Sequence, residues 1–316
     1  MAMNINWYPG HMKKTKEDIE NNLKLVDIVL EIIDARIPSS SRNPMLDEII
    51  GDKPRIIIMN KADLADKDIT SKWIEDYKNK GISALRLNSK ENINAKKIYD
   101  LARESLREKF DKHKEKNIEK QTIRMMIVGV PNAGKSTFIN NISKRKGANV
   151  GNRPGVTKTK QWIKTNANIE LLDTPGVLWP KFDEETGLNL SYTHAIKDEI
   201  LNIEDLTLKF LEKMKEEYPE NLQERYGVDA KKTALEIYED IARKRGAVTK
   251  GGDFDYTRTA NIILTDFRNG KLGRISLERP WNIQTITRKL KKKSMNIIIW
   301  LQALTKWVEV LWQDLL

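Results

Sequence analysis

The first half of the chain alternates short apolar runs with segments of helical periodicity. Val26–Ile33 and Arg55–Met59 are rich in β-branched residues, which is typical of strands buried on both faces of a parallel sheet. The same reasoning predicts strands at Ile82–Leu87, Ile123–Val128 and Ile169–Leu172, and helices at His11–Leu25, Met45–Ile50, Trp73–Lys80, Asn94–Phe110 and Thr137–Ile142. This order predicts an α/β fold with a parallel sheet.

Beyond Pro180 the pattern is helical only. Apolar residues recur at helical spacing in three series, which are Leu206, Phe210, Met214, then Leu235, Tyr238, Ile241, and finally Ala260, Ile263, Leu264, Phe267 before the C-cap pair Asn269-Gly270. We expect an α/β domain over residues 1–180, a smaller, mainly helical domain over 181–282, and a basic and then apolar tail over 283–316. The charge-rich stretch Asp111–Gln121 is interpreted as a connector within the first domain.

The composition of the chain excludes some kinds of site and indicates the kind of partner. The 316 residues include no cysteine, which excludes disulfides, cysteine-ligated metals and cysteine nucleophiles and fits a reducing cytoplasm. The N-terminus lacks the features of a signal peptide, so we expect a cytoplasmic protein. The net charge of +11 indicates a polyanionic partner, either nucleic acid or an anionic membrane surface. A Lys-rich proteome is the alternative explanation.

A phosphate-binding loop is predicted between the strand Ile123–Val128 and the helix Thr137–Ile142. Gly129–Ser136 matches the pattern G-x-x-x-x-G-K-[ST], in which backbone N–H groups surround phosphates and the lysine neutralises them. We expect nucleotide contacts from Asn132, Ala133, Gly134, Lys135, Ser136 and Thr137. The hydroxyl of Ser136 would complete an Mg²⁺ shell.

Two further segments suit the phosphate end of such a site. Asp173-Thr174-Pro175-Gly176 follows a predicted strand, so Asp173 suits Mg²⁺ and the Gly176 N–H suits the γ-phosphate. On its own this tetrapeptide could equally be a turn. Thr157, in Arg153–Thr157 between the two motifs, is a candidate Mg²⁺ ligand in a switch loop, with a plain Pro-Gly turn as the alternative.

Asn60-Lys61-Ala62-Asp63 directly follows a predicted strand and reads N-K-x-D. The Asp63 carboxylate accepts from guanine N1–H and the exocyclic amine, which adenine does not offer, and unpaired polar groups penalise the wrong base. Lys61 would pack over the base, and Asn60 would hold this loop to the phosphate-binding loop. Asn88-Ser89-Lys90 occupies the place of a second base-contacting loop.

The base-recognition segments precede the phosphate-binding segments, the reverse of the Ras-like order. In the usual notation, G4 and G5 are the base-recognition motifs and G1, G2 and G3 are the phosphate-binding and switch motifs. The order in this chain is G4-G5-G1-G2-G3, which is a circular permutation. Permutation is tolerable because the motifs converge in space and chain ends can be relocated to exposed loops. We therefore predict a P-loop GTPase domain with permuted motif order, followed by a helical domain.

The sequence closely resembles the bacterial circularly permuted ribosome-assembly GTPases, the ribosome biogenesis GTPase A family, over about residues 4–280. The resemblance also rests on Trp7–Met12, Asp34–Pro38, Gly252–Asp255 and Arg258–Ala260. It implies GTP hydrolysis with Mg²⁺, stimulated by the ribosomal particle, during late assembly of the large subunit, and a helical domain that contacts rRNA. Arg243-Lys244-Arg245 would suit phosphate contacts, or would simply be a solvated helix end.

The resemblance also suggests how hydrolysis proceeds. Val177 and Leu178 follow Gly176, where Ras-type enzymes carry a water-orienting glutamine. His11 is the suggested catalytic residue, with a histidine that merely touches RNA or solvent as the alternative. Asn132 resembles an asparagine that helps to coordinate K⁺ in related GTPases, so GTP/GDP, Mg²⁺ and K⁺ are the expected ligands.

The tail from Ser294 to Leu316 departs from the family. Its apolar residues, three tryptophans among them, are interrupted by polar ones, which indicates an amphipathic helix and not a membrane span. We expect a monomer that binds the large-subunit precursor and rRNA and does not contact a membrane through its tail. The alternatives are a GTP-dependent switch or membrane-surface module unconnected with the ribosome, and a plain P-loop ATPase.

Overall fold

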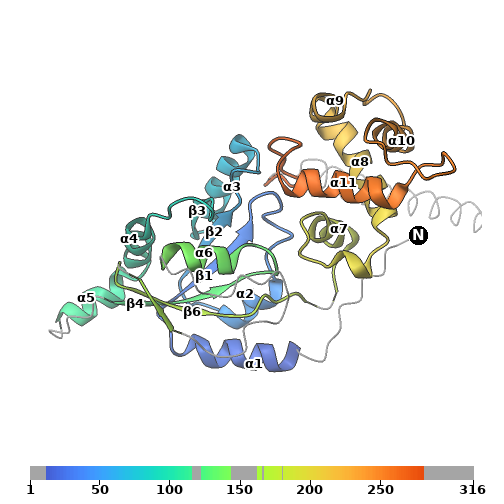
Figure 1. Cartoon of the computed structure of the whole chain (residues 1–316). Coiled ribbons are helices and arrows are strands. Elements are labelled where there is room, and N and C mark those ends of the chain that lie inside the picture. The colour runs from blue at the N-terminus through green and yellow to red at the C-terminus, as the bar shows by residue number, and fades with distance from the viewer. Residues whose placement is uncertain (1–11, 116–121, 144–161, 166, 180, 281–316) are drawn as a thin grey trace, which may run out of the picture. The chain divides into compact units, whose positions relative to one another are not determined.

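A six-stranded sheet organises the first part of the molecule. The computed structural model describes residues 12–115, 122–143, 162–165, 167–179 and 181–280, and within them the strand order is β3-β2-β1-β4-β6-β5 (Figure 1). The strands are β1 (Ile28–Asp34), β2 (Arg55–Asn60), β3 (Ser83–Arg86), β4 (Ile123–Val128), β5 (Trp162–Lys164) and β6 (Ile169–Asp173). All pairs are parallel except β5 with β6. The predicted α/β fold is confirmed.

The strand register brings the motif residues to one edge of the sheet. Asp34 lies opposite Asn60 in the β1–β2 pair, and Ile127 lies opposite Asp173 in the β4–β6 pair. The carboxyl ends of parallel strands open toward the same side, which is where ligands bind in open α/β sheets. Segments distant in sequence therefore meet at this edge.

Helices cover both faces of the sheet, and Figure 1 shows α1 and α2 on one side of the strands and α6 on the other. Alternate strand residues define the two faces, as the period of two requires. Val29, Ile33 and Ile57 belong to the face that packs against α1 (Met12–Leu23), α2 (Pro44–Ile50) and α3 (Lys67–Asn79). Leu30 and Ile58 belong to the other face, packed against α4 (Ala95–Ser105) and α6 (Lys135–Ile142).

After β6 the described chain is helical apart from one isolated bridge between Val248 and Phe254. Its elements are α7 (Glu184–Tyr192), the 3₁₀ turn η2 (Asp198–Ile200), α8 (Ile203–Glu217), α9 (Pro219–Tyr226), α10 (Ala234–Lys244) and α11 (Tyr256–Arg268). Phe210 of α8 lies between Tyr192 and Phe267, with ring centroids 5.1 and 4.9 Å away. None of these helices, nor any other in the described residues, is long and apolar enough to cross a membrane.

The described residues from Met12 to Glu278 belong to one compact unit. The expected boundary between domains at residue 180 lies inside this unit and stays a prediction. The tail 283–316, including its basic stretch and the amphipathic segment from Ser294 onward, lies outside the described residues.

Several element predictions were wrong in detail. The helix expected over Asn94–Phe110 is divided at Leu106 into α4 and α5 (Arg107–Glu115), so the stretch interpreted as a connector is helical as far as Glu115, which its Lys and Glu residues favour. α3 begins at Lys67, before Trp73, because the Asp66 side chain caps it by accepting from Asp68 N and Ile69 N.

Two further features differ from the sequence-based expectation. Strand β5 was not predicted, because an edge strand of three residues carries little periodic signal. Leu235 is 48% exposed, so the buried face of α10 comprises Ala234, Ile237, Tyr238, Ile241 and Ala242 instead.

Candidate nucleotide-binding site

The phosphate-binding loop connects β4 to α6 at the carboxyl edge of the sheet. Gly134, the N-cap of α6, has φ +98°, and Asn132 has φ +57°. Both values lie in the region that glycine and asparagine adopt most readily. The loop therefore leads into the first turn of α6, whose N–H groups have no partner within the helix. Ser136 and Thr137 lie there, half-buried.

Lys135 lies inside this loop. Its ammonium donates to the carbonyls of Gly129 at 3.0 Å and Val130 at 2.9 Å. Burial lowers the pKa of Lys135 to about 8, against the opposing charge of Asp173. Burial also raises the pKa of Asp173, which the Lys135 charge and a backbone hydrogen bond from Thr174 oppose. Lys135 and Asp173 therefore place a cation and an anion near each other in a poorly solvated part of the site.

The segment after β6 packs on the phosphate-binding loop. The Thr174 hydroxyl donates to Ile127 O at 2.6 Å, which fixes the start of the segment against β4. A Cβ on Gly176 would lie 2.8 Å from Lys135 Nζ and 2.9 Å from Pro131 Cα, so no larger residue fits there. Val177 and Leu178 are buried in the apolar core and offer nothing to a reacting water.

Asn60 holds three loops together at the other end of the site. Its side-chain amide donates to Ala133 O at 2.7 Å, and its Oδ1 accepts from Ser89 N at 3.0 Å. The contact that we expected between Asn60 and the phosphate-binding loop is thus present. The same amide explains Gly134, because a Cβ there would lie 2.2 Å from Asn60 Nδ2.

Three buried side-chain oxygens around these loops have no hydrogen-bond partner among the described residues. They are Asp63 Oδ1, Ser89 Oγ and Asp173 Oδ1. A buried polar atom without a partner costs free energy, and native proteins keep few of them unless a ligand, ion or water satisfies them. Asp63 and Ser89 lie in the two predicted base-contacting loops, and Asp173 in the predicted Mg²⁺ segment. These oxygens fit a guanine base and a magnesium ion.

Lys61 has an ionic partner that the sequence analysis did not assign. Its ammonium lies 3.0 Å from Asp34 Oδ2, and the Arg36 guanidinium forms a bidentate pair with the same carboxylate, at 2.9 and 2.7 Å. Burial alone would raise the pKa of Asp34, but the charges of Arg36 and Lys61 outweigh it and hold that pKa below its usual range. Asp34 and Arg36 were quoted only as part of a family motif.

The loop after β1 also connects the site to α11. The Arg36 guanidinium lies 4.8 Å from the centroid of the Phe267 ring, and Leu277 N donates to Arg36 O at 2.8 Å. Glu278 accepts from Ser39 N at 2.6 Å and Ser40 N at 2.9 Å. The base-recognition end of the site is therefore held against the helical part of the chain.

Asn132 contacts the helical part from the phosphate end. Its amide donates to His194 O at 2.5 Å, in the turn after α7. Arg268 holds the same turn, because it donates to Ser191 O and Tyr192 O and pairs with Asp198. His194 had no motif context in the sequence, and its role in this contact comes from its backbone carbonyl.

The structure gives fewer contacts for the other predicted residues. Asn88 and Lys90 lie in the turn after β3, where Lys90 N donates to Asn88 Oδ1 at 3.0 Å. Asn141 of α6, which the sequence analysis missed, donates to Ser89 O at 3.1 Å and Glu91 O at 2.5 Å and so supports this turn. No sequence motif marks it. His11 and Thr157 lie outside the described residues.

The described residues contain no group of three or more His, Asp or Glu side chains suited to a metal. A magnesium ion bound with a nucleotide needs only one or two protein ligands besides phosphate and water. Ser136 and Asp173 are sufficient donors for such an ion.

Loops after parallel strands, one of them a phosphate-binding loop and one an N-K-x-D loop, define the class: this is a P-loop GTPase. A family model described as "50S ribosome-binding GTPase" matches residues 124–238. Ribosome biogenesis GTPase A of Bacillus cereus is 46% identical over 280 residues, which are 88% of this chain and 95% of that protein. The chain therefore belongs to the ribosome biogenesis GTPase A family.

Two further comparisons agree with this assignment. Mitochondrial ribosome-associated GTPase 1 of Mus musculus is 33% identical, over 86% of this chain and 90% of that protein. The crystal structure of GNP-bound YlqF from T. maritima superposes with a TM-score of 0.60 at 31% identity, covering 84% of this chain and 98% of that one. The fold is thus shared with a protein whose structure contains a nucleotide.

Proposed function

We propose that this protein binds a precursor of the large ribosomal subunit in the cytoplasm and hydrolyses GTP there during late assembly. The observation that carries the nucleotide part of the proposal is the set of buried oxygens on Asp63, Ser89 and Asp173, which find no hydrogen-bond partner within the described part of the chain. The names of the relatives support the ribosomal target, and the charge of +11 suits an RNA-rich partner.

In this proposal the two ends of the site divide the nucleotide between them. Asp63 accepts from the guanine edge, Ser89 and its neighbours Asn88 and Lys90 border the base, and Lys61 packs over it. Residues 132–137 bind the phosphates through backbone N–H groups and the Lys135 ammonium. Ser136, Asp173 and Thr157 hold Mg²⁺, which neutralises charge on the phosphate oxygens, and the Gly176 N–H faces the γ-phosphate.

Two parts of the proposal concern hydrolysis. His11, which lies outside the described residues, orients or deprotonates the attacking water when the ribosomal particle is bound. Asn132 contributes its amide oxygen to a K⁺ ion. The contact from its amide nitrogen to His194 O supports this assignment, because it leaves the oxygen as the end of the side chain suited to a cation.

Residues 181–282 supply the rRNA contacts in this proposal, residues 1–180 form the GTPase domain, and the protein acts as a monomer. No role is proposed for the tail 283–316, which lies outside the described residues.

The test is GTP hydrolysis with and without purified large ribosomal subunits, in K⁺ and in Na⁺, for wild type and His11→Ala. We expect subunits to stimulate hydrolysis strongly, K⁺ to exceed Na⁺, and His11→Ala to lose the stimulation while GDP affinity is unchanged. Absence of stimulation in wild type would overturn the ribosomal role. Equal rates in K⁺ and Na⁺ would overturn only the role of Asn132, and full stimulation of His11→Ala only that of His11.

A further inference from the structure

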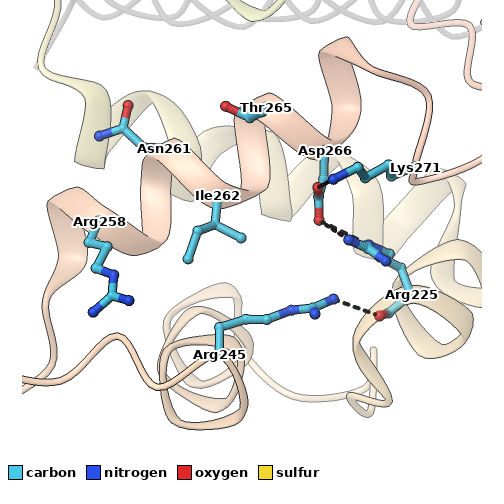
Figure 2. Close-up of a pocket in the computed structure, with 8 residues that line it drawn as sticks. All are labelled: Arg225, Arg245, Arg258, Asn261, Ile262, Thr265, Asp266 and Lys271. Carbon is cyan, nitrogen blue, oxygen red and sulfur yellow. Dashed lines mark hydrogen bonds and ion pairs between the residues drawn. The ribbon is translucent and has the colours of Figure 1, made fainter.

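The helical part of the chain carries a basic pocket that the nucleotide site does not use. It has a volume of about 470 Å³ and lies between α11 and the C-terminal ends of α9 and α10. Figure 2 shows Arg225 and Arg245 on one side of it and Arg258 and Ile262 projecting from α11 toward them. The pocket is therefore built from segments that are distant in sequence.

Positive charge exceeds negative charge in this pocket. Its lining includes Arg225, Arg245, Arg258 and Lys271 but a single acid, Asp266. Asp266 pairs with Arg225 at 2.8 Å and with Lys271 at 3.4 Å. These two cations are thus partly neutralised, while their geometry is fixed by the shared carboxylate.

The other two cations have no carboxylate partner within the described part of the chain. Arg245 donates to Arg225 O at 3.2 Å, and Arg258 donates to Gly246 O at 3.3 Å. The Arg245 guanidinium also lies 5.2 Å from the centroid of the Tyr226 ring. Each guanidinium carries five donors, so one backbone acceptor leaves most of its hydrogen-bonding capacity unused.

The end of α10 separates the three residues of the basic run 243–245. Arg243 pairs with Asp240 at 2.8 Å and lies over the Phe254 ring, and Lys244 donates to Gly227 O. Only Arg245 of the three lines the pocket. The helix end, and not the local charge, therefore selects the residue that is available to a ligand.

We infer that this pocket binds a backbone phosphate of RNA, with Arg245 and Arg258 donating to the phosphate oxygens. Guanidinium groups match phosphate in geometry and charge, and Asn261 and Thr265 on α11 add neutral groups of the kind that contact phosphate and sugar. The choice of RNA over an acidic protein rests on the proposed function and on the net charge of +11. The ion pairs of Asp266 with Arg225 and Lys271 hold the lining of the pocket in place.

The experiment compares single substitutions in the full chain. Binding of purified large-subunit rRNA is measured by filter retention at several salt concentrations for wild type, Arg245→Gln and Arg258→Gln. Arg243→Gln is the matched control, because it removes the same charge from a residue of the same basic run that pairs with Asp240 and does not line the pocket. We expect each pocket variant to weaken binding about fivefold or more and to reduce the slope of log affinity against log salt by about 1. Arg243→Gln should change neither by more than about twofold.

The outcomes separate this inference from the proposed function. If all variants bind rRNA equally, the pocket is not the phosphate site, whatever the subunits do. If wild type fails to bind rRNA at low salt, the inference is also overturned. If rRNA binding depends on the pocket but subunits neither bind nor stimulate hydrolysis, the inference stands and the ribosomal role fails. If polyglutamate displaces rRNA at equal charge concentration, the pocket serves acidic protein instead.

Discussion

At the residue scale, Asp63 presents a buried carboxylate oxygen that has no hydrogen-bond partner among the described residues. We predict that Asp63→Asn exchanges the base preference of the site. The introduced amide N–H₂ is a donor where the carboxylate was an acceptor, so it no longer pairs with the exocyclic amine of guanine. Xanthine carries a carbonyl acceptor in place of that amine and pairs with the amide. GDP affinity should fall by about 2 kcal/mol or more and xanthosine diphosphate affinity should rise.

Competition titrations with the two diphosphates measure this exchange. Asp68→Asn is the control, because Asp68 is exposed in the first turn of α3 and its charge change is the same. Retention of guanine preference by Asp63→Asn would remove Asp63 from the base site.

Lys135 gives the site a pH dependence with a defined sign. Its pKa is lowered to about 8 by burial, and a bound diphosphate stabilises the ammonium, so binding raises this pKa. Below pH 8 the lysine is already protonated and GDP affinity is constant. Above pH 8 binding must take up a proton, so affinity falls as pH rises, approaching tenfold per pH unit.

Equilibrium titration of GDP between about pH 7 and pH 9 tests this slope. Lys135→Arg is the control because a guanidinium stays charged throughout this range, and its affinity should be independent of pH. The same slope in both proteins would assign the effect to another group.

At the element scale, the phosphate-binding loop depends on the contact between its N-cap and the base loop. In Gly134→Ala the new Cβ would lie 2.2 Å from Asn60 Nδ2 at φ +98°, so the Asn60–Ala133 hydrogen bond must break or the loop must move. We predict a loss of about 1–3 kcal/mol in the free energy of unfolding and a GDP affinity at least tenfold weaker.

Gly246→Ala provides the comparison, because Gly246 also has positive φ, +62°, but nothing lies within 4 Å of the added Cβ. It should lose stability through backbone strain alone and retain GDP affinity. Urea unfolding and GDP titration of both variants separate the two effects. Equal GDP affinity in Gly134→Ala and wild type would contradict the role of this contact.

At the scale of the whole molecule, the nucleotide site touches α11 and its neighbours at both ends. At the base end, the Arg36 guanidinium packs over the Phe267 ring. At the phosphate end, the adjacent Arg268 hydrogen-bonds to the end of α7, next to the His194 carbonyl that accepts from Asn132. A rearrangement of either end must therefore be accommodated by the helical part. This is the physical basis on which nucleotide state and partner binding can be coupled, and such coupling is reciprocal.

We predict that Arg36→Met destabilises the protein by about 3–5 kcal/mol, because the buried Asp34 carboxylate loses its bidentate guanidinium and keeps Lys61 and the backbone N–H of residue 36 as partners. In Asp34→Asn/Arg36→Met the uncompensated charge is removed, so part of this loss should be recovered. Urea unfolding of the two single variants and the double variant gives the coupling energy. Additive losses would show that the Asp34–Arg36 pair contributes little.

The sequence by itself determined the α/β order, the phosphate-binding and N-K-x-D loops, and the switch to helices after Pro180. These features are local: a buried strand needs consecutive apolar residues, a loop around phosphate needs glycine and lysine at fixed spacing, and an amphipathic helix repeats every three to four residues. The end of α11 at Asn269-Gly270 was predictable for the same reason. The family was predictable as well, because several such motifs occur together in this chain.

Only the tertiary structure decided which side chains meet across the chain. The position of α3, the division of the helix at Leu106 and the short strand β5 depend on caps and edge pairing that leave weak periodic signals. The contact between Arg36 and Phe267 joins residues 231 positions apart, and the pocket brings together Arg225, Arg245 and Arg258 from the ends of α9 and α10 and from α11. The three basic residues 243–245 cannot be distinguished in the sequence. In the structure they lie at the end of α10, where each of them has a different partner.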